Sequence, residues 1–245
     1  MHDPTPPATD RPAPGLSLPH VAGLIRAAVP PMHRGGRPIV AAVAGAAAAV
    51  KIATGRGAAA GVLATAATAL FFRNPRRVRP PLTGVALAAA DGTVATVSDV
   101  LPPAELDLPR EPAPRVSVFL SVLDVHVQRV PVDGRVLDVA YRPGTFLSAD
   151  LDKASEDNER NAVLFETGDG GARIGVVQIA GLLARRIVCD IAPGDEVAAG
   201  ETFGLIRFGS RVDVYLPAGS RVVVAPGQRT IGGETVLAEL PRSDR

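Results

Sequence analysis

The chain has 245 residues and a formal net charge of +1 at pH 7, from 26 Lys and Arg against 25 Asp and Glu residues. This balance, without a long basic tract, gives no support to nucleic-acid binding. A single cysteine, Cys189, excludes an intramolecular disulfide, no Cys/His cluster has metal-ligand spacing, and the apolar run around Cys189 predicts a buried, unreactive thiol.

Residues 1–37 form a tail and a lead-in to the next segment. Residues 1–19 combine many prolines with Asp, Thr and Ala. Because such a composition buries too little apolar area to offset the entropy of ordering, we predict a flexible tail here.

Residues 38–72 are rich in Ala, Val, Gly and Leu and are interrupted only by Lys51 and Arg56. Each apolar run is shorter than the ~20 residues of a simple spanning helix. A tight hairpin of short, tilted helices, a helix lying partly in the membrane interface and an Ala-rich pair in a soluble core all fit. Because basic residues flank both outer ends, we expect membrane association with both ends in the cytoplasm. The flanking residues are Arg34, Arg37, Arg73, Arg76, Arg77 and Arg79.

From residue 73 to 245 the pattern changes to short Val-, Ile- and Leu-rich segments separated by Gly, Pro and Asp. No long helical periodicity remains, so we predict one mainly β domain. The expected strands cover 85–90, 94–98, 115–120, 135–142, 162–166, 173–180, 186–191, 202–207, 212–216 and 236–240.

Two internal echoes accompany the strand pattern. Residues 91–94 resemble 133–136, and 194–202 resemble 227–235, each of the latter with glycines six residues apart. Such spacing predicts tight turns on either side of a short strand, as in lipoyl- and biotinyl-type domains. We therefore expect a lipoyl/biotinyl-like barrel-sandwich β domain preceded by an apolar N-terminal helical hairpin. This likeness concerns the fold alone.

A Gly-Ser pair, Gly209–Ser210, lies between two apolar segments and on spacing alone indicates an ordinary turn. It resembles the self-cleavage site of phosphatidylserine decarboxylase proenzymes, commonly Leu-Gly-Ser-Thr. Phe208 and Arg211 replace Leu and Thr, as in the short archaeal and actinobacterial-type branch. The resemblance runs from about Phe71 to Leu240. It rests on the order of segments 71–77, 90–92, 119–121, 123–131, 143–146, 157–161, 178–181 and 204–210.

The resemblance implies a proenzyme that is cut after Gly209 into chains 1–209 and 210–245, which stay together as a heterodimer. The Ser210 hydroxyl would attack the Gly209 carbonyl, and elimination would convert Ser210 into a covalent pyruvoyl group. The pyruvoyl ketone would react with the amine of phosphatidylserine and accept the electron pair left when CO2 departs. The product would be phosphatidylethanolamine, with the β domain on the cytoplasmic side of the cell membrane and no metal required.

His126 is the only histidine of the predicted β domain, because His2, His20 and His33 precede it. A lone histidine is more often structural, but His126 matches the family's Asp-x-His motif, which implies a proton donor to the carbanion. Many relatives carry a second His as the base of self-cleavage where this chain has Arg129. That departure leaves the base for self-cleavage open.

Asp91 matches the acidic member of the family's processing triad, and it is also the first residue of an Asp-Gly turn. If Asp91 acts, it orients His126 or helps to deprotonate Ser210. Which arginine holds the lipid phosphate is open, because guanidinium geometry suits phosphate at several positions. The candidates are Arg142, Arg160, Arg185, Arg207 and Arg211.

Two other functions are compatible with parts of the sequence. The triplet 152–154, Asp-Lys-Ala, reproduces the setting of a lipoyl lysine, so a non-catalytic lipoyl/biotinyl-like carrier is an alternative. The polar run after Lys153 extends the loop beyond the tight hairpin that a carrier lysine needs. A membrane-attached structural domain without chemistry would remain one uncut chain.

Overall fold

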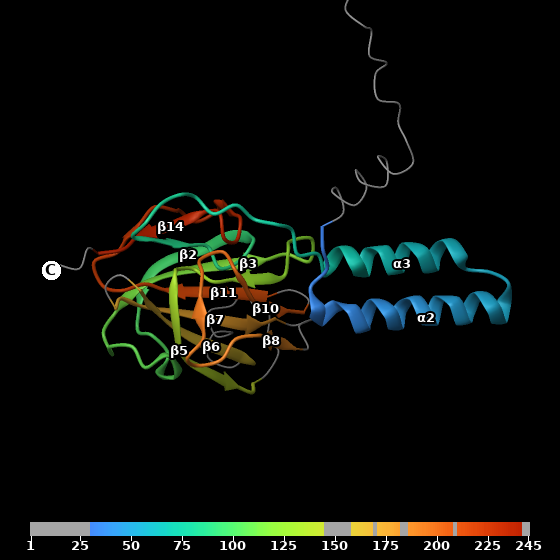
Figure 1. The fold of residues 1–245 in the computed structure, drawn as a ribbon, viewed down its shortest axis with the longest axis horizontal. Helices are drawn as coiled ribbons and strands as arrows, with labels where there is room; N and C mark the ends of the chain where they lie inside the picture. Colours follow the sequence, from blue (N-terminus) through green and yellow to red (C-terminus); the bar gives the residue numbers. More distant parts are fainter. Residues whose placement is uncertain (1–29, 145–157, 169–170, 182–185, 208–209, 242–245) are drawn as a thin grey trace, which may run out of the picture.

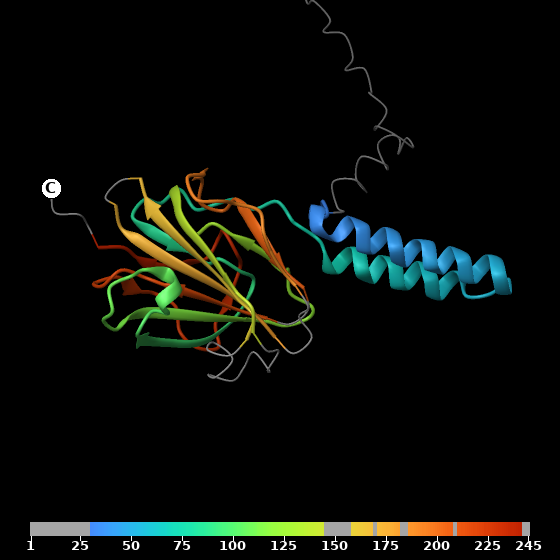
Figure 2. The same cartoon turned by 90° about the horizontal axis from the view of Figure 1, so that it is seen from below.

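The computed structural model describes residues 30–144, 158–168, 171–181, 186–207 and 210–241, and shows a helical hairpin projecting from one end of a β domain (Figures 1 and 2). The helices are η1 (Arg34–Gly36), α2 (Arg37–Thr54), α3 (Ala58–Phe71) and η2 (Ala104–Leu106). The longer strands are β2 (Gly92–Val100), β3 (Ala113–Leu120), β5 (Gly134–Arg142), β6 (Arg160–Thr167), β7 (Arg173–Ala180), β10 (Thr202–Ile206) and β11 (Ser210–Tyr215). The shorter strands are β1 (Val85–Leu87), β4 (Val127–Arg129), β8 (Ile187–Cys189), β9 (Glu196–Val197), β12 (Arg221–Val222), β13 (Arg229–Thr230) and β14 (Val236–Glu239).

The hairpin is formed by α2 and α3, and no residue of α2 is buried in the β domain. α2 has a proline in its first turn and ends at Gly55, whose φ of 69° is the left-handed conformation that glycine adopts most easily. The helices approach closely, since a Cβ on Gly61 would lie 2.6 Å from the Ala47 Cβ. The segment from Arg34 to Thr54 is long and apolar enough to cross a membrane, and α3 is shorter. The predicted helix pair is confirmed, and its exposure is compatible with membrane association.

The base of the hairpin is packed against the β domain. The backbone N–H of His33 donates to the carbonyl of Phe72 at 2.9 Å, and the buried His33 side chain lies 3.2 Å from the Asp190 carboxylate. The buried rings of Phe71 and Phe72 join a hydrophobic cluster with Val125, Val127 and Leu205. This cluster joins the hairpin to β4 and β10. Of the predicted lead-in, residues 30–37 therefore belong to this packed base.

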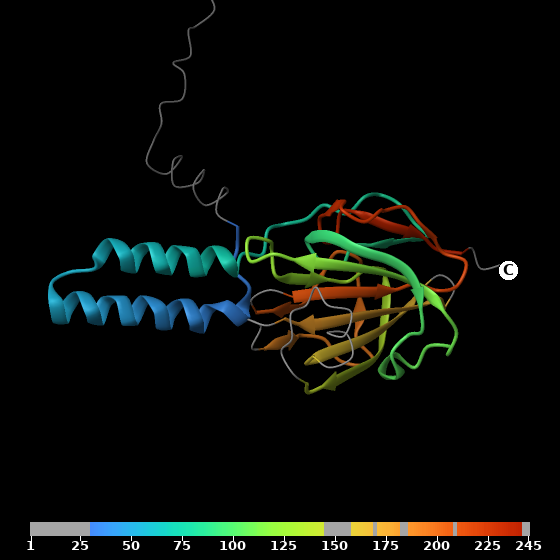
Figure 3. The same ribbon diagram turned by 180° about the vertical axis from the view of Figure 1, so that it is seen from behind.

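The β domain is built on an eight-stranded sheet in the order β13-β2-β3-β11-β7-β6-β5-β9. Two three-stranded sheets, β1-β14-β12 and β4-β10-β8, complete it, and every described pairing is antiparallel. Seen from behind, the strands of the large sheet curl around the core (Figure 3). Alternate residues such as Val118, Val176 and Val212 fill this core. The mainly β fold is confirmed, whereas the lipoyl/biotinyl-like assignment stays a prediction.

The echo between 194–202 and 227–235 corresponds to two equivalent edge strands. Gly194 and Gly200 flank β9, Gly227 and Gly233 flank β13, and all four have φ values between 78° and 94°. β9 and β13 are the two edges of the large sheet, and a Cβ on Gly233 would lie 3.0 Å from the Gly200 Cα. The curled sheet therefore brings its two edges together at this glycine contact.

The shorter echo, Asp91 with Asp133, belongs to the same internal repeat. The backbone N–H of Gly232 donates to Asp91 at 2.8 Å, and that of Ala199 donates to Asp133 at 2.9 Å. Each aspartate thus ties the start of a strand, β2 or β5, to the turn that follows the neighbouring edge strand.

Candidate active site

Ser210 is the first residue of β11, the strand at the centre of the large sheet. It is paired with Leu120 of β3 on one side and with Ala180 of β7 on the other. Directly opposed residues in antiparallel strands point to the same face, so Ser210 faces the core with these two neighbours. Its Oγ is buried and has no hydrogen-bond partner among the described residues. Gly209, the predicted cleavage partner, lies outside the described residues.

His126 lies at the same end of the domain as Ser210, directly before β4. The His126 carbonyl accepts a hydrogen bond of 3.1 Å from the N–H of Ile206, the last residue of β10. Ser210 follows Ile206 by four positions and is paired with Leu120, from which the chain leads to His126. Two neighbouring connections, β3 to β4 and β10 to β11, therefore bring the predicted nucleophile and the predicted proton donor to one region.

The imidazole of His126 is fully buried and faces the hairpin. Its ring centroid lies 4.2 Å from that of Phe71, and its Nδ1 is 3.0 Å from the carbonyl oxygen of Asp124. A carbonyl only accepts hydrogen bonds, so this contact assigns the proton to Nδ1 and leaves Nε2 as an acceptor in the neutral ring. Burial lowers the pKa of His126 to about 4. At neutral pH the ring is therefore uncharged.

Asp124 closes the loop that positions His126. Its carboxylate accepts hydrogen bonds from the backbone N–H of Ser121 at 2.8 Å and from the Ser121 hydroxyl at 2.7 Å, and it is paired with Arg229. Burial alone would raise the pKa of Asp124, but the bonds from Arg229 and Ser121 outweigh it and lower the pKa. A charged Asp124 thus fixes the turn whose carbonyl orients the imidazole.

A buried chain of amides extends from His126 into the large sheet. Gln128 donates to the His126 carbonyl, Gln178 donates to Gln128, and Asn161 donates to Gln178, each at 2.9 Å. Gln178 is paired with Val212, two residues along β11 from Ser210 and on the same face. These amides therefore support both the histidine loop and the serine strand.

This chain of amides was not predicted from the sequence, although Asn161 and Gln178 lie in segments 157–161 and 178–181, which carry the family resemblance. A further side chain of segment 157–161, Asn158, donates to the carbonyl of Ala180 at 2.7 Å, beside Ser210. Polar residues within otherwise apolar strands were the available signal.

Comparison with known proteins decides the family. The family model described as phosphatidylserine decarboxylase matches residues 64–238. The chain belongs to the phosphatidylserine decarboxylase family. It is 61% identical to the phosphatidylserine decarboxylase proenzyme of Saccharopolyspora erythraea, over 92% of this chain and 95% of that protein. It is 56% identical to the proenzymes of Rhodococcus erythropolis and Rhodococcus jostii, over 97% of this chain and 98% of each relative. The resemblance read from the motifs is confirmed.

Arg129, for which the motif resemblance implied a departure from a second histidine, is a buried cross-link in the structure. Its guanidinium donates to the carbonyl of Gly200 at 2.8 Å, to Asn74 Oδ1 at 2.7 Å and to the carbonyl of Pro75 at 2.6 Å. A guanidinium has no acceptor site and stays protonated, so it offers no base. Arg129 instead ties the segment after the hairpin to the turn at the edge of the sheet.

Asp91 and its repeat equivalent Asp133 have similar partners but different surroundings. Each aspartate accepts a hydrogen bond from one backbone N–H group, as described above, and from one arginine. Asp91 is bound by Arg77 at 2.6 Å, and Asp133 is bound by Arg79. The Asp91 side chain is 14% exposed and that of Asp133 is 62% exposed. Burial raises the pKa of Asp91, against the effect of its hydrogen bonds and of Arg77. Neither hydrogen-bond partner of Asp91 is His126 or Ser210.

The five arginines considered as ligands of the lipid phosphate lie in different parts of the chain. Arg142 and Arg160 both donate to Glu105, and Arg211 forms a two-bond pair with Asp213. Arg207 lies at the hairpin base, where its Nη2 donates to the Gly35 carbonyl at 3.3 Å and its buried Nε has no partner among the described residues. Arg185 lies outside the described residues.

The buried neutral state of His126 predicts a pH dependence of stability. Since its pKa falls from an ordinary value of 6.5 to about 4 in the folded chain, the unfolded chain binds more protons between these pH values. The free energy of unfolding should therefore fall as pH falls through this window, by roughly 3 kcal/mol for this group. Denaturant unfolding of uncut Ser210→Ala protein at pH 7.5 and pH 4.5 measures the fall. Adding His126→Gln should remove most of it, and an unchanged fall would place its origin elsewhere.

Proposed function

We propose that this chain is a proenzyme that cuts itself between Gly209 and Ser210 and then decarboxylates phosphatidylserine to phosphatidylethanolamine. Membership of the phosphatidylserine decarboxylase family supports the reaction. The structural observation that carries the proposal is the buried, unpartnered hydroxyl of Ser210 at the head of the central strand. A buried hydroxyl without a partner costs about 1–3 kcal/mol, and such groups in native folds call for a functional reason.

Self-cleavage uses groups of this chain alone, with water. The Ser210 Oγ adds to the carbonyl carbon of Gly209 as the peptide C–N bond breaks, which gives an ester and a free amine. Removal of the Ser210 Cα proton then expels the Gly209 carboxylate and leaves a carbon–carbon double bond at position 210. Tautomerisation and hydrolysis release ammonia and leave the pyruvoyl group.

The strand pairing explains why the two products should stay together. The small chain, residues 210–245, would contain β11, β12, β13 and β14. β11 is bonded on both sides by strands of the large chain, β3 and β7, and its residues Val212 and Val214 are fully buried. The cut would thus leave a heterodimer with an intact sheet, and we propose this as the mature form.

His126 is the proposed proton donor in turnover. A pyruvoyl group at position 210 supplies a ketone that accepts the electron pair released when CO2 leaves. The His126 ring begins neutral, and an anionic lipid headgroup bound beside it would raise its pKa and favour the protonated form. Asp124 holds the ring in place through its carbonyl, and the packing of Phe71 on the ring keeps water away.

The hairpin and the catalytic end of the β domain support a location at the cytoplasmic face of the cell membrane. Besides the hairpin, the tip of the β3–β4 loop exposes Val122 by 51% and Leu123 by 81%. Arg73, which follows α3, donates to the Leu123 carbonyl at 2.6 Å, so this apolar tip lies beside the hairpin base. We propose that the hairpin and the tip hold the site at the lipid headgroups.

The curled sheet and its repeated glycine-flanked edge strands support the lipoyl/biotinyl-like assignment as part of this proposal.

Arg207 is the proposed ligand of the lipid phosphate. In phosphatidylserine the phosphate lies between the acyl-bearing glycerol and the reacting serine. Arg207 is similarly placed in the protein, between Gly35 at the hairpin base and the β10 end that is bonded to His126. Its unpartnered Nε adds a donor that a phosphate oxygen would satisfy.

Changes at Ser210 and His126 should separate processing from turnover. Ser210→Ala should leave one uncut, inactive chain, because no hydroxyl remains to attack. His126→Ala should still yield cleaved protein but release CO2 from phosphatidylserine at least ~100-fold more slowly, the usual contribution of a positioned proton donor. Intact-mass analysis and a CO2 assay on the cleaved fraction measure both effects. A normal rate from that fraction would remove His126 from the mechanism, and an uncut chain would make it the processing base.

Asp91 is proposed to assist self-cleavage, and Asp133 provides a matched control. The two aspartates have equivalent partners, but Asp91 is the less exposed of the two, and a carboxylate with a raised pKa can take up a proton. We expect Asp91→Asn to slow self-cleavage at least ~10-fold, within the range of acid–base assistance, and Asp133→Asn to leave the rate unchanged. The rate is followed on gels after synthesis. Equal rates in the two variants would assign Asp91 to the turn alone.

Loss of the Arg207 guanidinium should weaken substrate use without blocking the cut. Arg207→Met should lower kcat/KM for phosphatidylserine about 10- to 100-fold, as expected for a charge-assisted hydrogen bond, mainly through KM. Arg142→Met is the control, because Arg142 is exposed and bound to Glu105. Both variants should be cleaved normally. Identical kinetics of the two variants would contradict the assignment of Arg207.

A further inference from the structure

A second group of buried polar atoms lies on the opposite face of the large sheet. Thr96 Oγ1, Arg115 Nε and Ser117 Oγ are buried and have no hydrogen-bond partner among the described residues. Thr96 on β2 is paired with Ser117 on β3, and Arg115 lies two residues from Ser117 on the same face. Three unpartnered donors within two adjacent strands are costly to bury, which suggests that something polar binds there.

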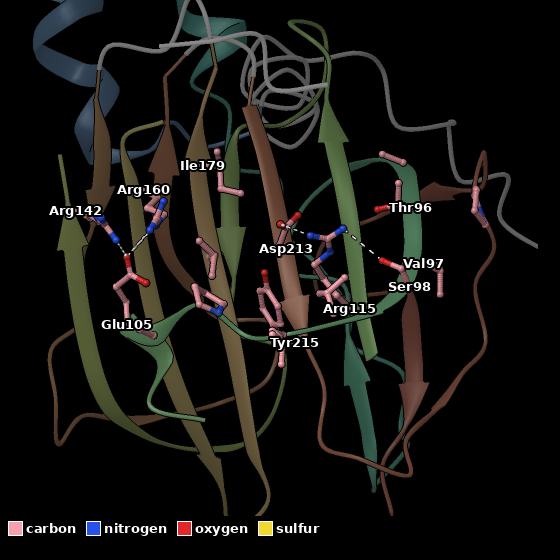
Figure 4. Close-up of a pocket in the computed structure, with 17 residues that line it drawn as sticks. Thr96, Val97, Ser98, Glu105, Arg115, Arg142, Arg160, Ile179, Asp213 and Tyr215 are labelled. Carbon is pink, nitrogen blue, oxygen red and sulfur yellow. Dashed lines mark hydrogen bonds and ion pairs between the residues drawn. The ribbon is translucent and has the colours of Figure 1, made fainter. Parts of the chain in front are cut away.

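Thr96 and Arg115 line a cleft of about 890 Å³ on the outer face of the sheet (Figure 4). Its lining also includes Ser98, Asp213 and Tyr215. Along β11, Asp213 and Tyr215 alternate with the core-facing positions, so the cleft and the Ser210 side chain lie on opposite faces. The cleft is therefore separate from the proposed active site.

The charges in the cleft leave Arg115 incompletely paired. The Asp213 carboxylate accepts two bonds of 2.9 Å from Arg211, whereas the nearest approach of Arg115 to it is 3.9 Å. Arg115 also makes a long bond of 3.4 Å to the hydroxyl of Ser98 and a hydrogen bond to the phenol of Tyr215, while its buried Nε has no partner among the described residues. At the other side of the cleft, Glu105 is shared by two further arginines, Arg142 and Arg160. Among the described lining residues, the three guanidinium groups of Arg115, Arg142 and Arg160 exceed the two carboxylates of Glu105 and Asp213 by one positive charge.

The cleft also presents hydroxyl groups around the guanidinium of Arg115. Ser98, Arg115 and Tyr215 are aligned across β2, β3 and β11, and Thr96 lies in the next row. Burial raises the pKa of Tyr215, so its phenol stays protonated and can donate. One guanidinium with several hydroxyl donors suits a tetrahedral oxyanion better than a planar carboxylate, because phosphate offers acceptors in more directions.

We propose that this outer cleft is a second binding site, for a phosphate group held by Arg115 with the hydroxyls of Thr96 and Ser98. The phosphate belongs to a soluble phosphate compound or to the headgroup of an anionic lipid. In the cleaved protein β3 belongs to the large chain and β11 to the small one. A ligand that contacts Arg115 and Tyr215 therefore joins the two chains and stabilises their pairing.

The test uses the full chain in detergent with inorganic phosphate as the probe. An Arg207→Met background excludes phosphate held at the proposed substrate site. Titration calorimetry and thermal unfolding should show saturable binding and a rise in Tm, since a ligand that binds only the folded state stabilises it. Arg115→Met should abolish both signals, and Thr96→Val should weaken binding about fivefold through the loss of one hydrogen bond. Arg135→Met, on the same sheet but paired with Glu166 away from the cleft, should bind as the parent does.

Absence of saturable binding, or binding unchanged by Arg115→Met and Thr96→Val, would overturn the proposal. If Arg115→Met fails to fold, Arg115→Lys replaces it, and weaker binding is expected because lysine lacks the planar fork. Competition then identifies the source of the phosphate. Tighter binding of short-chain phosphatidylglycerol than of glycerol phosphate assigns a lipid headgroup, and the reverse order assigns a soluble compound. Since none of these measurements involves decarboxylation, their outcome is independent of the proposed reaction.

Discussion

The central position of β11 constrains everything else in the molecule. Ser210 begins a strand that is hydrogen-bonded on both sides and whose inward side chains lie in the core. A backbone cut immediately before such a strand leaves the pairing of residues 211–215 and their core contacts in place. Self-cleavage can therefore alter the chemistry of residue 210 while the packing that positions it persists. Cleavage within β11 would instead expose apolar surface and unpaired backbone groups.

The hairpin is physically continuous with the site. Phe71 packs both on Phe72 and on His126, and the cluster with Val125, Val127 and Leu205 lies between the helices and the β4–β10 pair. Burial in this cluster is also what lowers the pKa of the imidazole. A movement of the hairpin relative to the β domain would change the solvation of His126. The position of the hairpin and the protonation of the imidazole are therefore coupled through the same aromatic contact.

Local sequence patterns predicted most elements but not the contacts between distant ones. All ten expected strands are present, and 173–180 is reproduced without change as β7. β4 and β12 were missed because two of the three β4 residues, Gln128 and Arg129, are polar and β12 has only two residues. Both internal repeats could be seen in the sequence. The contact between Gly200 and Gly233 could not, because it depends on how the sheet curls. Likewise, Ser210 and His126 could be singled out from the sequence and Arg207 could be given only as one of five arginines, whereas the Gln128–Gln178–Asn161 chain required the strand register.

Unpartnered buried groups distinguish the two faces of the large sheet. Ser210 faces the core at the end of the domain that carries His126, while Thr96, Arg115 and Ser117 lie on the outer face, where Thr96 and Arg115 line the cleft. A fold selected for stability alone would pair or replace such groups, since each costs free energy that apolar residues of similar size would not. At Ser210 this cost is consistent with the proposed attack of the hydroxyl on Gly209. At Arg115 self-cleavage offers no such reason, and the proposed phosphate ligand would supply the missing acceptor.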